Sequence, residues 1–319
     1  MSWDTPIRKE LDLVEEEIWK NVDSKQALLM DICMHVIGAG GKRIRPGLAL
    51  LAYKAVGGKS APNIIGIAAA FELIHSATLI HDDINDSGEL RRGRVAAYKK
   101  FGVQKALIAG DFLFVRSFRL GGYWNQKVVE IISEACTATA ESEILQQAYE
   151  FDPNTRLETY LKIIEGKTAM SMWAACKVGA YLGEGAQRQI EHIGQFGLNV
   201  GMAFQIVDDM LDINGNVKDL GKPKGVDLTD GKPTLPLMIA MKDKKVGKRL
   251  SAIFVKEKKG KEEVEEALEL VLRTDALERS HKKACGFADK ALDHLSTIKD
   301  SSYKESMQQL VESILNRKM

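Results

Sequence analysis

The sequence lacks several features of secreted and membrane proteins. It has only four cysteines, Cys33, Cys136, Cys176 and Cys285, which lie far apart and form no CxxC pair. We expect them to be free thiols in a reducing compartment. The N-terminal segment MSWDTPIRKELDLVEEE is too highly charged for a signal peptide. Apolar stretches such as residues 64–71 are too short to span a bilayer. These absences predict a cytoplasmic protein without an integral membrane segment.

Neither sign of charge dominates. Lysine and arginine number 45, aspartate and glutamate number 44, and the formal net charge is +1. A net charge this close to zero gives no general electrostatic attraction to nucleic acid or to an anionic membrane. The chain also lacks a Pro-, Gly- or Ser-rich linker and any abrupt change in composition. We therefore predict a single domain over residues 1–319.

Proline is scarce and unevenly placed. The seven prolines are absent from residues 63–152, 154–222 and 237–319. Because helix interiors exclude proline, and because these stretches are rich in Ala, Leu, Glu, Lys and Met, the sequence predicts an all-α fold. We expect helices at about residues 7–20, 25–38, 44–56, 62–85, 94–100, 103–121, 126–149, 156–181, 187–213, 233–243, 247–256, 261–273, 276–298 and 302–317.

Two acidic clusters of the same spacing each follow an apolar run. The first is Asp82, Asp83 and Asp86, and the second is Asp208, Asp209 and Asp212. On a helix, the first and last aspartates of each cluster share a face. Acids near a helix C-terminus are disfavoured by about 0.3 kcal/mol or more each, so a cation is expected nearby. Carboxylates suit Mg²⁺, which prefers one or two of them together with water and substrate phosphates. The pair of clusters therefore favours Mg²⁺ bound to a diphosphate.

Basic residues cluster at four places. They are Lys42, Arg43 and Arg45; Arg91, Arg92 and Arg94; Lys167, followed by Thr168; and Lys222, Lys224 and Lys232. The Gly40-Gly41-Lys42 stretch lacks the spacing of a P-loop, so phosphate binding would fall to side chains. Arginine suits bidentate phosphate contacts and lysine suits point-charge contacts. We expect the aspartates and arginines of residues 82–94 to bind a shared metal diphosphate rather than each other.

These motifs resemble those of trans-isoprenyl diphosphate synthases, the polyprenyl synthetase family, and they occur along the chain in the same order as in that family. The matching stretches are GGKRIRP (40–46), ELIHSATLIHDDINDSGELRRG (72–93), AGD (109–111), EGKTA (165–169) and residues 204–236. The resemblance implies the isoprenoid synthase fold, with long helices around a deep central cavity, and usually a homodimer. It also implies an enzyme that condenses isopentenyl diphosphate head-to-tail with an allylic diphosphate and releases pyrophosphate.

The resemblance assigns roles to individual residues. Mg²⁺ on the allylic diphosphate would be held by Asp82, Asp83 and Asp86, with Asp208, Asp209 and Asp212 completing the metal set. The allylic diphosphate would contact Arg91, Lys167, Lys222 and Lys232. Isopentenyl diphosphate would contact Lys42, Arg45, His75 and Arg92. The catalytic residues would be Lys167, Thr168 and Gln205, of which Thr168 and Gln205 would line the site near the developing cation.

Product length should depend on residues that precede the first acidic cluster. Thr78 and Ala77 lie four and five residues before Asp82. In the family, aromatic residues at these positions block the growing tail, and here neither residue is aromatic. Ile74 and Phe71, further back, could form a floor. We therefore expect a product of C20 or longer, with C20–C30 favoured.

Three alternatives account for less of the pattern. A di-iron bundle would use Glu72-x-x-His75 and Glu278-x-x-His281, but it leaves the paired aspartate clusters unexplained. A non-catalytic subunit of a heteromeric synthase would usually lose one aspartate cluster. A terpene cyclase would carry a mixed Asn/Ser/Glu second cluster and would not need the isopentenyl diphosphate residues.

Overall fold

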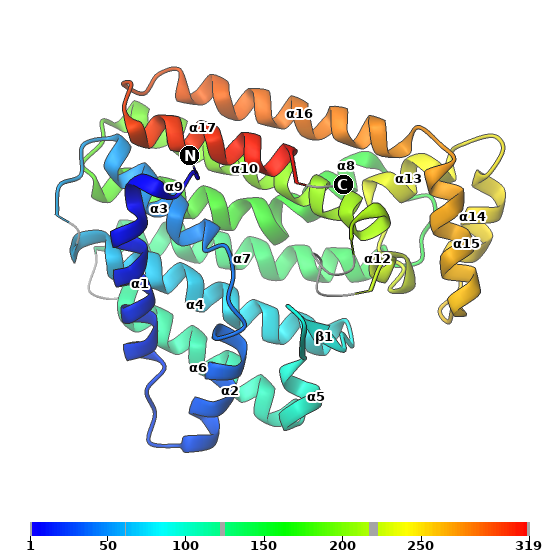
Figure 1. Ribbon diagram of the computed structural model, residues 1–319, viewed down its shortest axis with the longest axis horizontal. Coiled ribbons are helices and arrows are strands. Elements are labelled where there is room, and N and C mark those ends of the chain that lie inside the picture. The colour runs from blue at the N-terminus through cyan, green and yellow to red at the C-terminus, as the bar shows by residue number, and fades with distance from the viewer. Residues whose placement is uncertain (1, 61, 122–124, 217–222, 318–319) are drawn as a thin grey trace. The chain divides into compact units, whose positions relative to one another are not determined.

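The computed structural model describes residues 2–60, 62–121, 125–216 and 223–317. The fold is all-α, as predicted (Figure 1). The first helices are η1 (Thr5–Ile7), α1 (Arg8–Asn21), α2 (Ala27–Ile37), α3 (Ile44–Ala55), α4 (Pro62–Asn85), α5 (Ala97–Phe101), α6 (Val103–Gly121) and α7 (Gln126–Ala148). The later helices are α8 (Leu157–Ile164), η2 (Glu165–Ala169), α9 (Met170–Leu182), α10 (Gln187–Asn214), α12 (Val226–Thr229), α13 (Leu235–Met241), α14 (Gly247–Phe254), α15 (Lys261–Leu272), α16 (Ala276–Leu295) and α17 (Ser302–Leu315).

The helix predictions hold in place and approximate length, except that no helix was expected at α12 and that two others differ in extent. The helix expected over residues 94–100 begins only at Ala97, because β1 (Leu90–Arg91) and β2 (Arg94–Val95) form an antiparallel hairpin. The helix expected over residues 156–181 is interrupted by η2, a π-turn. The proline and composition pattern could not show either feature, because both depend on local hydrogen bonding.

The described chain forms two compact units. The first consists of residues 2–133, 174–194 and 295–309, and the second of residues 134–173, 195–294 and 310–317. Each unit has its own buried apolar residues. The single domain predicted from the sequence stays a prediction.

In the first unit, α4 is the central helix. It packs against α1, α3 and α6, and the β-hairpin follows its C-terminal end (Figure 1). Ile64, Ile67, Leu73 and Ile80 are almost completely buried. Burying a side chain of this size stabilises a fold by about 1.5–3 kcal/mol. The helix that carries the first aspartate cluster is therefore anchored along its length.

One helix of the described chain, Ile64–Asn85, is long and apolar enough to cross a membrane. Of its most apolar window, 61% is buried inside the protein. The sequence expectation considered only the shorter apolar stretch of residues 64–71. The whole helix is therefore longer than the apolar stretch judged too short to span a bilayer. Most of its apolar window is nevertheless buried, as in the core helix of a folded protein.

In the second unit, α13, α14 and α15 enclose a separate apolar cluster (Figure 1). Leu250, Phe254 and Val271 are fully buried in it, and Leu228 of α12 also packs there. This core holds the segment that follows the second aspartate cluster, because α12 and α13 flank Lys232 in the chain.

Candidate active site

The first aspartate cluster lies at the C-terminal end of α4. The helix ends at Asn85, and the Asp86 N–H donates to the Asp82 carbonyl (2.8 Å). Asp82 and Asp86 are half-buried, whereas Asp83 is only 4% exposed. The expectation that the two outer aspartates share a face is consistent with this burial, since the middle one points inward.

Asp83 and Arg91 form a direct ion pair, contrary to the expectation that these groups would not bind each other. Both Nε (2.8 Å) and Nη2 of Arg91 donate to Asp83 Oδ1. Burial raises the pKa of Asp83 although Arg91 favours its charged form. A buried carboxylate without a counter-charge would be strongly destabilising, which explains the pair. The aspartate thereby orients the guanidinium of Arg91.

The β-hairpin turn sets the direction of the arginines. Arg92 and Gly93 both have positive φ, 52° and 74°. A two-residue hairpin with this backbone matches the twist of its strands, at a cost of about 1 kcal/mol for the non-glycine residue. An Arg92 Nη1 N–H donates to the Gly40 carbonyl, which ties the hairpin to the loop before α3.

Arg43, a member of the first basic cluster for which no separate role was predicted, organises the loop that carries Lys42 and Arg45. It has φ 47°, and its guanidinium pairs with Glu15 and with Glu72 Oε1 (2.6 Å). Burial alone would lower the pKa of Arg43, but the two glutamates outweigh it and raise the pKa. Glu72 is 2% exposed, so the di-iron alternative loses one of its proposed ligands to an ion pair.

The isopentenyl diphosphate residues share one electrostatic environment. Burial lowers the pKa of Arg45 to about 10, with a further contribution from Arg92. Burial, together with the nearby arginines, holds the pKa of His75 well below 6.5. The imidazole of His75 therefore lies among cationic side chains. Lys42 is exposed on the same loop.

Stability should depend on pH through His75. In the unfolded chain its pKa is about 6.5, whereas the folded protein keeps it neutral well below that value. The unfolded state therefore binds a proton that the folded state does not, and stability falls as pH drops below about 6.5. Between about pH 7.5 and about pH 5.5, the wild type should lose about 1 kcal/mol more unfolding free energy than His75→Gln. Urea unfolding at both pH values measures this, and equal losses would contradict it.

The residues assigned to product length differ in burial. Thr78 and Ile74 are half-buried, whereas Ala77 and Phe71 are buried, at 0% and 3% exposure. Ile74, Thr78 and Asp82 are spaced four residues apart, so they lie along one face of α4. The accessible wall before the aspartates is thus the face of Thr78 rather than that of Ala77.

In the second unit, the EGKTA motif forms the π-turn η2. Glycines let neighbouring helices approach it closely. A Cβ on Gly166 would lie 2.5 Å from the Ala138 carbonyl oxygen, and one on Gly201 would lie 2.4 Å from Ala169 Cα. π-turns are frequent at functional sites. The close approach of α10 brings Thr168 to Gln205.

A chain of hydrogen bonds links the catalytic candidates to the second aspartate cluster. Thr168 Oγ1 donates to Gln205 Oε1 (2.7 Å), and Gln205 Nε2 donates to Asp209 Oδ1 (2.8 Å). The Tyr160 hydroxyl donates to Asp209 Oδ2 (2.7 Å). Burial and the nearby Asp227 raise the pKa of Asp209 although both donors favour its charged form. The sequence carried no signal for Tyr160, which lies 49 residues from its partner.

The three aspartates of the second cluster are not equivalent. Asp209 and Asp212 are buried, and Asp212 Oδ2 accepts the Asp227 N–H (3.1 Å). Asp208 has 39% side-chain exposure and pairs with Arg317 Nη1 (3.3 Å). Arg317 also lies over the ring of Phe204, 4.8 Å from its centroid. Asp208 is thus the most accessible of the three, and Arg317 is a second residue that the sequence pattern did not indicate.

Two of the lysines assigned to the allylic diphosphate have carboxylate partners. Lys167 Nζ lies 2.6 Å from Glu143, and Lys232 Nζ lies 3.1 Å from Asp230. Both ammonium groups are therefore held in place within the second unit. Lys222, the remaining lysine of this set, lies outside the described residues.

Phe151 fixes the loop that carries Lys232. Its φ is 61°, its N–H donates to the Gly231 carbonyl (2.8 Å), and its ring would lie 2.4 Å from a Cβ on Gly231. Lys259 Nζ lies over the same ring, 4.7 Å from the centroid, and donates to the Thr229 carbonyl (3.3 Å). The ring and the ammonium group together clamp residues 229–231, immediately before Lys232.

Gly231→Ala should disrupt this clamp. A Cβ there would meet the Phe151 ring, and φ +72° is strained for alanine. We expect a loss of about 2 kcal/mol or more in unfolding free energy, together with a fall in kcat. Gly102→Ala is the matched control, because its φ is also positive (+91°) but nothing lies within 4 Å of a Cβ. Equal losses in urea unfolding of the two variants would show that the ring contact has no role.

The donor atoms of the aspartate clusters fit Mg²⁺. Within the described residues, no group of three or more His, Cys, Asp and Glu side chains is arranged to hold a metal ion by itself. Mg²⁺ does not require such a cage, because it takes one or two carboxylates and completes its shell with water and phosphate. The half-buried Asp82, Asp86 and Asp208 supply oxygen donors of this kind.

Comparison with known proteins agrees with these features. The sequence model of the family described as polyprenyl synthetase matches residues 26–271. The chain belongs to this family. It is also similar to the all-trans-nonaprenyl-diphosphate synthase (geranyl-diphosphate specific) of Rhodobacter capsulatus, with 35% identity over 313 residues, 98% of this chain and 96% of that one.

Solved structures of the polyprenyl synthetase family extend the likeness to the fold. A polyprenyl synthase from Caulobacter crescentus, complexed with calcium and isoprenyl diphosphate, has a TM-score of 0.96 and 33% identity over 99% of this chain and 97% of that one. A geranylgeranyl pyrophosphate synthetase from Pyrococcus horikoshii has a TM-score of 0.90 and 32% identity over 99% and 98%. The isoprenoid synthase fold is confirmed, and the chain is a prenyltransferase, a trans-polyprenyl diphosphate synthase.

Proposed function

We propose that this polyprenyl synthetase joins isopentenyl diphosphate head-to-tail (1'-4) to an allylic prenyl diphosphate in the cytoplasm. Its product is an all-trans polyprenyl diphosphate of C20 or longer, with C20–C30 favoured. The main support is the charge arrangement of the first unit. The charges of Asp82 and Asp86 help to raise the pKa of Arg91. The charge of Arg45 helps to lower the pKa of His75, so these two residues are close together. Acids for a metal and cations for phosphates thus occur together.

The difficult step is ionisation of the allylic substrate. Its C1–O bond breaks and both electrons leave with the diphosphate, while C4 of isopentenyl diphosphate forms the new C–C bond. A proton then leaves C2, and by family analogy the departing pyrophosphate accepts it. Mg²⁺ held by the aspartates would neutralise charge on the leaving diphosphate. No protein nucleophile is needed.

The chain's own residues would bind and orient both substrates. We assign Arg91, Lys167, Lys222 and Lys232 to the allylic diphosphate, and Lys42, Arg45, His75 and Arg92 to isopentenyl diphosphate. Fixed cations stabilise a leaving diphosphate without reorganising during the reaction. The Thr168 hydroxyl donates a hydrogen bond to Gln205 Oε1 and so orients the amide. The dipoles of the Thr168 hydroxyl and the Gln205 side-chain carbonyl would stabilise the developing allylic cation.

Product length remains within this proposal. The names of similar proteins range from short-chain isoprenyl to decaprenyl diphosphate synthases, so these names do not narrow the product length. The non-aromatic side chain of Thr78, on the accessible face of α4, supports a tail longer than farnesyl.

A homodimer is also proposed, on the outward face of α6. Leu107, Ile108, Val115 and Phe118 are exposed on this helix, and Val115 is 66% exposed. Clustered large apolar side chains of this kind mark interaction surfaces. A second copy of the chain would cover them.

Val115→Glu should therefore convert a dimer to a monomer, because it would bury a charge in the interface. Val255→Glu is the control, since Val255 is exposed at the end of α14 rather than on α6. Light scattering after size exclusion measures both. A monomeric wild type, or a dimeric Val115→Glu, would contradict the assignment.

The function is tested by incubating the protein with Mg²⁺, isopentenyl diphosphate and each allylic primer in turn, then sizing the products by mass spectrometry. We expect products of C20 or longer and a stoichiometric release of pyrophosphate. A C15-only product would refute the proposed length. Failure to consume isopentenyl diphosphate with any primer would refute the function.

A further inference from the structure

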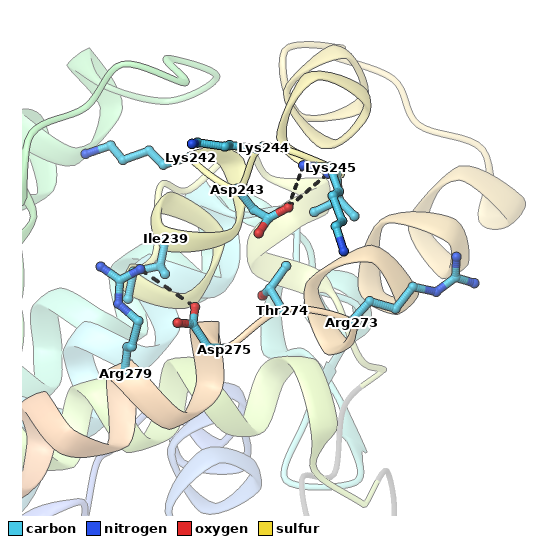
Figure 2. Close-up of a pocket in the computed structure, with 10 residues that line it drawn as sticks. Ile239, Lys242, Asp243, Lys244, Lys245, Arg273, Thr274, Asp275 and Arg279 are labelled. Carbon is cyan, nitrogen blue, oxygen red and sulfur yellow. Dashed lines mark hydrogen bonds and ion pairs between the residues drawn. The ribbon is translucent and has the colours of Figure 1, made fainter.

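A basic hollow lies in the second unit, beyond the end of α13. Its volume is about 700 Å³. The turn of residues 242–246 forms one wall, and the α15–α16 turn with the start of α16 forms the other (Figure 2). None of the residues assigned to prenyl transfer lines it.

Cations dominate the lining of this basic hollow. They are Lys242, Lys244, Lys245, Arg273 and Arg279, against only two carboxylates, Asp243 and Asp275. In Figure 2, Lys245 and Arg279 stand on opposite sides of the two carboxylates. Such an excess of one sign in a concave site attracts ligands of the opposite charge.

Both carboxylates already have donors from the protein. Asp243 Oδ1 accepts the backbone N–H groups of Lys245 (2.8 Å) and Val246 (3.1 Å), which lower the pKa of Asp243. Asp275 lies 3.7 Å from Arg279. Arg273 pairs with Glu269 (3.1 Å), whereas among the residues that the structure describes no acidic side chain forms an ion pair with the three lysines. Their charge is therefore available to a ligand.

An apolar hollow adjoins the basic one. Its volume is about 240 Å³, and the two share Ile239, Lys242 and Arg279. Leu157, Leu235 and Met238 form most of the rest of its wall. Figure 2 shows Arg279 beside Ile239, and both residues line the two hollows. A ligand bound by the cations could thus extend a hydrocarbon group into apolar surroundings.

We propose that the two hollows together bind an amphiphilic diphosphate, with the diphosphate on the cations and a prenyl tail in the apolar hollow. Arginine and lysine are the usual phosphate-binding residues, and the basic hollow is of the size of small-molecule sites. The choice of a prenyl tail rests on the proposed function, since such compounds are the substrates and products of that reaction. The site would be separate from the prenyl-transfer site.

The test measures binding of farnesyl diphosphate and of inorganic pyrophosphate by equilibrium dialysis in EDTA. Chelation removes the Mg²⁺ on which aspartate-mediated binding depends, and any binding that the prenyl-transfer cations retain in EDTA is common to the variant and its control. The variant is Lys245→Glu/Arg273→Glu, and the control is Lys258→Glu/Lys282→Glu, which makes the same charge change at exposed lysines outside the hollow. We expect the variant to weaken both ligands about tenfold or more, and the control to bind within about twofold of the wild type.

A third variant separates the two parts of the ligand. Leu157→Ser should weaken farnesyl diphosphate but leave pyrophosphate unchanged, because Leu157 lines the apolar hollow and not the basic one. Equal binding by the charge variant and its control would overturn the proposal, and so would equal affinity of the wild type for the two ligands. Binding only to vesicles of phosphatidylcholine and phosphatidylserine in equal parts would overturn it in favour of a membrane surface. Turnover with Mg²⁺ is measured separately, so an inactive enzyme that binds in EDTA would refute the proposed function alone.

Discussion

Asp82→Ala should lower kcat/KM by about 10³-fold or more. Asp82 is half-buried on the accessible face of α4, and its charge acts on both Arg45 and Arg91. Removing the Asp82 carboxylate would take away a ligand of Mg²⁺ and would also remove a negative charge that partly neutralises the two guanidinium groups. Losing one preorganised electrostatic contact in an active site costs about 10²–10³-fold, and a metal ligand should reach the upper end of that range.

The control for this substitution is Asp12→Ala. Asp12 is exposed on α1 and far in sequence from the cluster, so turnover should be unchanged. Melting temperatures of both variants exclude a folding defect, and kinetics with isopentenyl diphosphate and an allylic primer give the rate. Retention of activity within about tenfold by Asp82→Ala would refute the assignment of the first cluster to the metal.

Thr78→Phe should shorten the product, and it should do so more than Ala77→Phe. Thr78 lies one turn before Asp82 on the accessible face of α4, so a phenyl group there would stand in the path of the tail. Ala77 is completely buried. A phenyl group at a packed position costs about 1–3 kcal/mol of stability and would leave the length unchanged.

Ile74→Phe provides a graded comparison. Ile74 lies one further turn, about 5.4 Å, from Asp82, so its product should be longer than that of Thr78→Phe. Mass spectrometry sizes the products and urea unfolding reports the stability of each variant. A shift with Ala77→Phe alone would show that the tail follows the other side of the helix.

The sequence predicted the helices well because their signals are local. Proline-free stretches of helix-forming residues gave most helices, and α4 has the predicted bounds. The sequence also placed all six aspartates on or directly after α4 and α10. Spacing within one helix determines such placements.

Side-chain contacts between residues far apart in the sequence could not be predicted. Tyr160 reaches Asp209, Arg317 reaches Asp208, and nothing in the spacing of either pair marks them as neighbours. The Asp83–Arg91 ion pair was missed for a different reason. The sequence showed both charges but not the burial of Asp83, and burial is what makes a direct counter-charge necessary.

The π-turn η2 also changes which side chains face the same way. An α-helix advances about 100° per residue, so the eight residues from Tyr160 to Thr168 would leave these side chains roughly 80° apart. A π-turn takes one residue more than an α-turn, so the same eight residues turn only about as far as seven would, roughly 20° short of two full turns. Tyr160 and Thr168 therefore share an angular position, and each hydroxyl reaches one end of the Gln205–Asp209 pair. Without the extra residue, the two side chains would point in directions roughly 80° apart.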